Sequence, residues 1–104
     1  PKKKIFIHHV YFWLKNPSSE ADKNKLIEGL TGLSKVPTIR FHHIGTPAST
    51  NRSVIERGYS VSWMLFSDNL EEEEIYQKHP IHLKFVEDYS HLWEKVIVYD
   101  SEQI

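Results

Sequence analysis

Hydrophobic and polar positions along the chain follow two periods, which predict four strands and two helical regions. Alternation with a period of two predicts strands at 5–14, 38–44, 59–66 and 95–100. Helical spacing predicts one helix at about 19–35 and a second helical region that starts at Glu71. Pro80 should interrupt this second region, because a proline inside a helix loses a hydrogen bond and clashes with the preceding turn.

The order of these elements is strand–helix–strand–strand–helix–strand. This is the order of the ferredoxin-like α+β fold, in which a four-stranded antiparallel sheet carries both helices on one face. We expect one domain over residues 1–104, because this length gives room for a single core. The segment 45–58 is rich in Gly, Pro, Ser, Thr and Asn and is predicted to be a loop. The first strand is apolar on both faces and should therefore lie inside the sheet.

Both faces of the predicted sheet are apolar, and this predicts a partner chain. We expect the helices to cover the face that carries the following residues: His9, Tyr11, Trp13, Val61, Trp63, Leu65, Val96 and Val98. The opposite face would carry Phe6, Val10, Phe12, Leu14, Met64, Phe66, Ile97 and Tyr99. A monomer rarely exposes an apolar patch of that size. We therefore expect a homodimer that packs sheet against sheet.

Composition narrows the function mainly by exclusion. Thirteen basic and fourteen acidic residues leave a formal net charge of -1, which argues against a nucleic-acid or anionic-membrane binder. The chain has no cysteine, so disulfides and thiolate chemistry are excluded. No segment approaches the roughly 20 apolar residues that a membrane helix needs. We expect a soluble, cytoplasmic protein without nucleic-acid or membrane partners.

Several segments resemble the stress-responsive A/B barrel (Dabb) family. The first is the opening strand at 9–15, and the most specific is the segment 76–86, which contains the pattern His-Pro-x-His at 79–82. Gly45, the Gly-Tyr pair at 58–59 and the closing strand also match, so the resemblance spans almost the whole chain. It implies a dimeric α+β barrel. It implies little about activity, because most members of the family, and bacterial ones in particular, have no assigned function.

One plant member of this family is a polyketide cyclase, which performs an intramolecular aldol condensation in a pocket between sheet and helices. Its catalytic tyrosine and histidine correspond by motif to Tyr76 and His82, and its pocket histidine on the first strand corresponds to His9. Another pocket histidine corresponds to Val61 and is therefore absent here. The resemblance implies His82 as a base and Tyr76 as a hydrogen-bond donor to an enolate oxygen.

A ligand site on the helix-covered face would combine an apolar cavity with a few polar groups. The side chains predicted to contact the ligand are His9, Tyr11, Trp13, Trp63, His79 and Phe85. We expect a small aromatic or polyketide-like ligand and no cofactor, and whether a lyase reaction follows stays open. One alternative is a non-catalytic stress-related or structural oligomer, with aromatic rings filling the interior and histidines bonded to the backbone near Pro80. The other is a cofactor-independent oxygenase or isomerase.

The seven histidines also require a metal site to be considered. Neighbours in a strand point to opposite faces, so neither adjacent pair, 8–9 or 42–43, would chelate one ion. His79 and His82 could share a helix face, but metal sites need three or four ligands and no further ligand is evident. We therefore predict no metal site. The acidic run at 71–74 is interpreted as solvated surface that suits a helix N-terminus.

Overall fold

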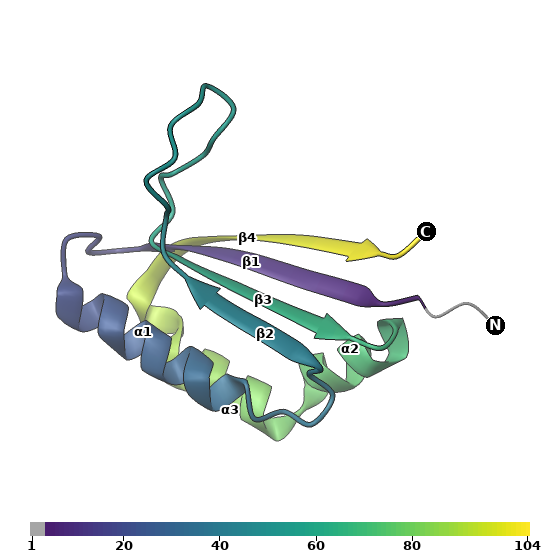
Figure 1. The fold of residues 1–104 in the computed structure, drawn as a ribbon. Coiled ribbons are helices and arrows are strands. Elements are labelled where there is room, and N and C mark those ends of the chain that lie inside the picture. The colour runs from purple at the N-terminus through teal and green to yellow at the C-terminus, as the bar shows by residue number, and fades with distance from the viewer. Residues whose placement is uncertain (1–3) are drawn as a thin grey trace.

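The computed structural model describes residues 4–104. The strands are β1 (Phe6–Leu14), β2 (Phe41–Gly45), β3 (Val61–Ser67) and β4 (Trp93–Glu102). The helices are α1 (Glu20–Leu33), α2 (Leu70–Lys78) and α3 (Pro80–Tyr89), with a 3₁₀ turn at Ser90–Leu92. The strands form one antiparallel sheet in the order β2-β3-β1-β4, and the helices lie on one side of it (Figure 1). This confirms the ferredoxin-like α+β fold and the interior position of β1.

Side-chain caps and one proline define where the helices begin and end. The Ser19 hydroxyl accepts a hydrogen bond from the Asp22 backbone N–H at the start of α1. The Asn69 side chain does the same for α2, and both residue types are strong N-caps. His79 is extended because it precedes a proline, and Pro80 then opens α3 at a position that needs no N–H. The predicted interruption at Pro80 is confirmed, and it divides the second helical region into α2 and α3.

The strand boundaries differ modestly from the prediction. β2 begins at Phe41 instead of Thr38. The residue before it, Arg40, donates its backbone N–H to the Phe66 carbonyl of β3. β4 extends beyond the predicted 95–100 at both ends, because its backbone pairs with β1 from Trp93 to Glu102. Backbone pairing continues into polar residues, which the apolar alternation could not reveal.

The side chains of β1 face the opposite way from the prediction. Val10 lies opposite Trp63 of β3 and Val98 of β4, so it shares their face of the sheet. The β1 residues on this helix-covered face are Phe6, His8, Val10, Phe12 and Leu14, all of them buried. The residues on the other face are Ile7, His9, Tyr11 and Trp13, all of them half-buried. Alternation shows which residues share a face, but the two apolar faces of β1 left the choice between them undetermined.

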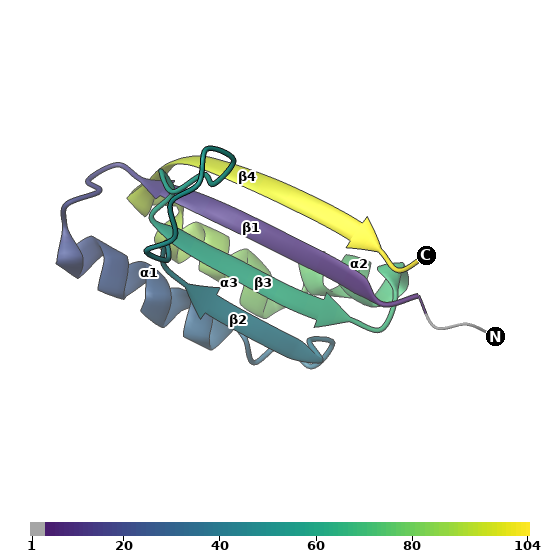
Figure 2. The ribbon, with the colours of Figure 1, turned by 45° about the horizontal axis from the view of Figure 1, so that its top comes forward.

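The helices cover the sheet unevenly. Leu26, Leu30 and Leu33 of α1 are fully buried in the core, where α1 lies against β2 and β3. Figure 2 shows β2 and β4 at the two edges of the sheet, with the helices behind it. On β4, Val96 and Val98 point to the helix side but remain 43% and 45% exposed. The space between the helices and the sheet is therefore accessible along β4.

The opposite face of the sheet, which we call the outer face, is largely apolar, and no helix within residues 4–104 covers it. It carries Ile7, His9, Tyr11, Trp13, Phe41, Met64, Phe66, Ile97 and Tyr99. Phe41 is 51% exposed and Tyr99 is 63% exposed. The loop between β2 and β3 projects from this side of the sheet (Figure 1). The predicted positions of Met64, Phe66, Ile97 and Tyr99 on this face agree with the structure, whereas those of Phe6, Val10, Phe12 and Leu14 were wrong.

No helix within residues 4–104 has the length and apolar character required to cross a membrane.

Candidate functional site

A cavity of about 300 Å³ lies between the sheet and helices α2 and α3. Its apolar lining includes Val10, Phe12, Trp63, Phe85 and Trp93, and its polar lining consists of His8, Tyr76, Gln77, His82 and Asp100. The half-exposed side chains of Val96 and Val98 line the β4 edge of the cavity. An apolar cavity with a few convergent polar groups is the usual form of a small-molecule site.

Tyr76 and His82 meet in this cavity from opposite sides of the helix break. Their ring centroids are 4.8 Å apart in an edge-to-face arrangement. On one continuous helix, two residues six positions apart would point about 120° away from each other. The extended conformation of His79 and the new start at Pro80 remove this constraint. The break predicted from the sequence is therefore the feature that brings the two side chains together.

The polar atoms of this pair have few protein partners. The Tyr76 side chain is buried, and its hydroxyl oxygen accepts a hydrogen bond from the Trp63 indole N–H at 3.1 Å. The hydroxyl proton of Tyr76 is not used in that bond and can be donated to a ligand. The Nδ1 atom of His82 is buried without a hydrogen-bond partner. A buried polar atom without a partner is costly, so a bound ligand could supply what the protein does not.

Burial shifts both groups toward their neutral forms. It raises the pKa of the Tyr76 hydroxyl above its ordinary value, against the opposing effect of the Trp63 hydrogen bond. It lowers the pKa of the His82 imidazole, and the nearby His8 lowers this pKa further, against the opposing effect of a hydrogen bond to the Gln77 backbone. At neutral pH, His82 can then accept a proton while Tyr76 still carries one. These are the protonation states that a general base and a hydrogen-bond donor require.

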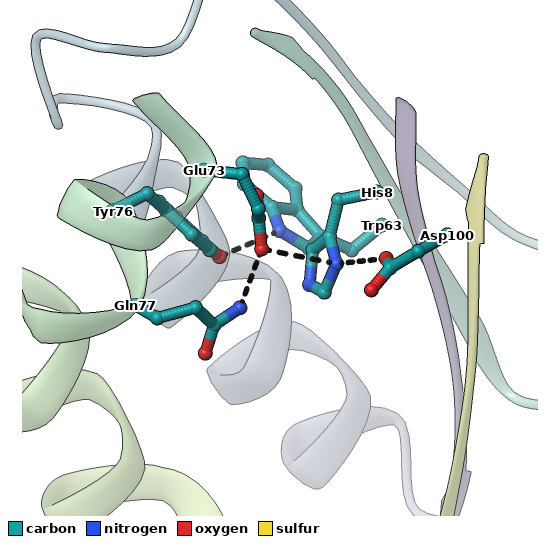
Figure 3. A network of polar contacts seen from close by, with 6 residues as sticks. All are labelled: His8, Trp63, Glu73, Tyr76, Gln77 and Asp100. Atoms are coloured by element: carbon teal, nitrogen blue, oxygen red, sulfur yellow. Dashed lines mark hydrogen bonds and ion pairs between the residues drawn. The ribbon is translucent and has the colours of Figure 1, made fainter. Parts of the chain in front are cut away.

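Beside this pair, a polar network surrounds His8 (Figure 3). The His8 Nδ1 atom lies 2.7 Å from Oδ1 of Asp100 and 3.4 Å from Oε2 of Glu73. The Gln77 amide donates a hydrogen bond of 2.7 Å to the same Glu73 oxygen. Figure 3 shows Glu73 reaching from α2 toward His8 on β1, with Asp100 on β4 beyond it. The network therefore connects one helix to two strands at the polar end of the cavity.

Glu73 lies inside the protein, so its assignment to solvated surface was wrong. It is 4% exposed, and its Oε1 atom has no hydrogen-bond partner. Positions 73 and 76 are three apart on α2 and face the same way, so the turn that buries Tyr76 also buries Glu73. Burial raises the pKa of the Glu73 carboxyl, whereas the Gln77 hydrogen bond and His8 lower it.

Four predicted site residues lie at the cavity, and four do not. Tyr76, His82, Trp63 and Phe85 line it. The predicted placement of His9, Tyr11 and Trp13 on the helix side was wrong, because β1 presents its other face there.

On the outer face, the His9 ring stacks on Tyr11 with centroids 4.5 Å apart. His79 caps α3, and its Nδ1 atom accepts a hydrogen bond from the Ile81 N–H at 3.1 Å. This matches the structural alternative considered for His79.

His8, Gln77 and Asp100 are functional candidates that the sequence reasoning missed. His8 lies in the cavity position that was expected for His9. The adjacent pair of histidines at 8–9 indicated that one of them would face the helices. Asp100 stands opposite His8 in the β1–β4 register, which sequence alone does not provide. Within the described part of the chain, no three or more His, Cys, Asp or Glu side chains are grouped so as to hold a metal ion.

The elements define a ferredoxin-like α+β domain with a cavity between sheet and helices. Residues 6–103 match the family model described as the Stress responsive A/B Barrel Domain, Dabb. The chain belongs to this family. A search of curated proteins finds no match.

Solved structures share this fold. A Dabb family protein of Mesorhizobium loti has a TM-score of 0.80 at 19% identity, covering 98% of this chain and 99% of that one. A dimeric ferredoxin-like protein of unknown function from Thermobifida fusca has a TM-score of 0.78 at 14% identity, with coverages of 98% and 93%. The hydroxynitrile lyase of Passiflora edulis has a TM-score of 0.80 at 18% identity, with coverages of 99% and 96%. At identities this low, the structural similarity establishes a common fold and no shared activity.

Substituting Glu73 by glutamine should stabilise the protein at neutral pH. The native carboxyl has a raised pKa, so its contribution to stability is full below the ordinary glutamate pKa and is lost as pH rises through the folded-state value. The glutamine amide carries no charge and avoids this loss. We expect Glu73→Gln to gain about 1–3 kcal/mol at pH 8, the range for a poorly satisfied buried polar group, and little at pH 4.

Urea denaturation at the two pH values measures this difference. Glu87→Gln on the exposed surface of α3 removes the same charge and should show no comparable dependence on pH. Glu73→Gln that is equally destabilising at both pH values would contradict the burial argument.

Proposed function

We propose that this protein binds a small organic molecule in the cavity between sheet and helices, and that His82 and Tyr76 move a proton on it. The observation that carries the proposal is the convergence of these two side chains at the cavity. The Nδ1 atom of the His82 ring is buried there without a hydrogen-bond partner. The aromatic lining of Phe12, Phe85 and Trp93 suits a ligand with an aromatic or polyketide-like body. The Passiflora relative is a hydroxynitrile lyase, which supports the idea that this fold can host a lyase.

In the reaction we propose, His82 removes a proton from a carbon next to a carbonyl group. The lowered pKa keeps the imidazole neutral and able to accept that proton. The negative charge then develops on the carbonyl oxygen, where the Tyr76 hydroxyl donates a hydrogen bond. The Trp63 N–H bonded to the Tyr76 oxygen holds the hydroxyl in place. No step of this proton transfer requires a cofactor.

Deuterium exchange into a ketone tests the proposal. In D₂O, the wild-type protein should accelerate exchange at the carbon next to the carbonyl of 1-phenylpropan-2-one, followed by proton NMR. His82→Gln should lower the protein-dependent rate by about 100-fold or more, the usual contribution of a general base. Tyr76→Phe should slow exchange while circular dichroism shows that the fold is retained.

His9→Gln is the matched control, because it makes the same exchange of side chains on the outer face. It should leave the rate unchanged. Exchange no faster than in buffer, or an equal rate in wild type and His82→Gln, would contradict the proposal and favour the non-catalytic alternative.

We also propose that two copies of this chain pack through their outer faces. The support is the row of half-buried and exposed apolar side chains on that face, among them Tyr11, Ile97 and Tyr99. A neighbouring structure from Thermobifida fusca is described as dimeric. This dimer leaves the cavity on the other side of the sheet, with its own opening along β4.

A further inference from the structure

The polar end of the cavity is rich in acceptors, and among residues 4–104 His8 is the one side chain lining it that can carry a positive charge. No lysine or arginine occurs among the described residues that line it. Asp100 lines the cavity with a side chain that is 46% exposed. Glu73 lies directly behind His8, with 5% of its side chain exposed and its Oε1 atom unpartnered. The charged side chains at this end are therefore two carboxylates around one histidine.

This charge arrangement disfavours an anionic ligand. His8 can carry at most one positive charge, and its Nδ1 atom is already within 2.7 Å of Asp100 and 3.4 Å of Glu73. Among the described residues, a carboxylate or phosphate group in the cavity would meet no lysine or arginine and would lie close to like charges. Burying an unpaired charge next to like charges is costly.

The remaining polar atoms favour a ligand that donates hydrogen bonds. The Gln77 amide nitrogen uses one of its two N–H groups to bond to Glu73, and the Gln77 carbonyl oxygen is a further acceptor at this end of the cavity. Asp100 has a second carboxylate oxygen beyond the one that contacts His8. Figure 3 shows these groups together, with the Glu73 carboxylate pointing toward His8. A ligand headgroup with several N–H bonds would satisfy acceptors that the protein leaves open.

Beyond this polar end, the cavity is lined by stacked aromatic rings. Phe85 and Trp93 stack with ring centroids 5.8 Å apart, and Phe12 lies 4.8 Å from Trp93. These rings can pack against an apolar body, and their faces also attract a cation that approaches them. The cavity thus combines an acidic end with an aromatic wall.

We propose that the ligand of this cavity carries a primary amine in addition to its carbonyl group and aromatic body, and that its ammonium group binds beside Asp100, with Glu73 adding negative charge from behind His8. This inference rests on the proposed function to the extent that the ligand binds in the same cavity. It narrows the broader expectation of an aromatic or polyketide-like ligand to ligands that carry a positive charge.

Three probes of similar size and different charge test the inference: 2-phenylethylamine, 2-phenylethanol and 3-phenylpropionate. Isothermal titration calorimetry at pH 7 should rank the affinities as amine, then alcohol, then carboxylate. We expect the amine to bind at least about tenfold more tightly than the carboxylate, as one charged hydrogen bond would provide. Asp100→Asn should abolish this preference, whereas the surface variant Glu87→Gln, with the same change in net charge, should keep it.

Each outcome bears on a defined claim. Equal affinities for the three probes, or tighter binding of the carboxylate, would overturn the amine inference. A preference for the amine that survives Asp100→Asn would overturn it too, because the ammonium would then bind elsewhere. In both cases, ketone exchange that depends on His82 would leave the proposed function standing. If no probe binds and no ketone exchange occurs, both proposals fail.

Discussion

Replacing Trp63 with alanine should remove a large part of the stability of this protein. The indole is 1% exposed and is among the largest fully buried side chains of the core. Truncating a buried tryptophan costs about 3–5 kcal/mol, while small domains have only about 5–15 kcal/mol in total. The substitution also removes the N–H that bonds to the Tyr76 hydroxyl. Urea denaturation followed by circular dichroism should show a lower midpoint or a protein already partly unfolded in buffer.

Trp63→Phe separates packing from hydrogen bonding. It keeps an aromatic ring on the core face of β3 but lacks the indole N–H, so it should cost clearly less than alanine. Because the Tyr76 oxygen loses its donor, this variant should also slow ketone exchange while remaining folded. A loss below about 1 kcal/mol for Trp63→Ala would contradict the role of this side chain in the core.

Placing a charge on the outer face should convert the proposed dimer into a monomer. Ile97 is half-buried on this face, opposite Tyr11 in the register. In a sheet-to-sheet dimer, Ile97→Asp would bury a carboxylate in each copy of the apolar interface, and an unpaired buried charge is strongly unfavourable. Sedimentation equilibrium should give twice the chain mass of 12.3 kDa for the wild type and 12.3 kDa for the variant.

Leu83→Asp is the control for this experiment. Leu83 is 57% exposed on α3, away from the outer face, so this variant should remain dimeric. Circular dichroism establishes that both variants are folded. A wild-type chain that sediments as a monomer at micromolar concentration would contradict the dimer, as would an Ile97→Asp variant that dimerises normally.

The order of the elements and the break before α3 could be predicted because both depend on local sequence. A proline kinks or breaks a helix wherever it occurs in its interior, and Asn69 caps the helix that follows it directly. Tyr76 and His82, which do meet at the cavity, were implied by the resemblance of segment 76–86 to the Dabb family. The apolar character of both sheet faces was also evident from alternation alone.

The choice of face on β1 could not be predicted, because it depends on pairing with distant strands. Both sets of alternating β1 residues are apolar or aromatic, and each contains one histidine of the adjacent pair. Only the register of Val10 with Trp63 and Val98 shows that His8 faces the helices. Glu73 illustrates the same limit: within a run of four glutamates, the orientation of α2 against the sheet decides which one is buried.

The most direct test of the proposed site is an NMR titration of the histidine imidazoles with 1-phenylpropan-2-one. Substitutions of single histidines by glutamine assign the resonances. If the ligand binds between sheet and helices, the signals of His82 and His8 should shift with a common dissociation constant. The signals of His9 and His43 on the outer face should stay in place. Shifts at His9 and His43 without shifts at His82 would contradict the account.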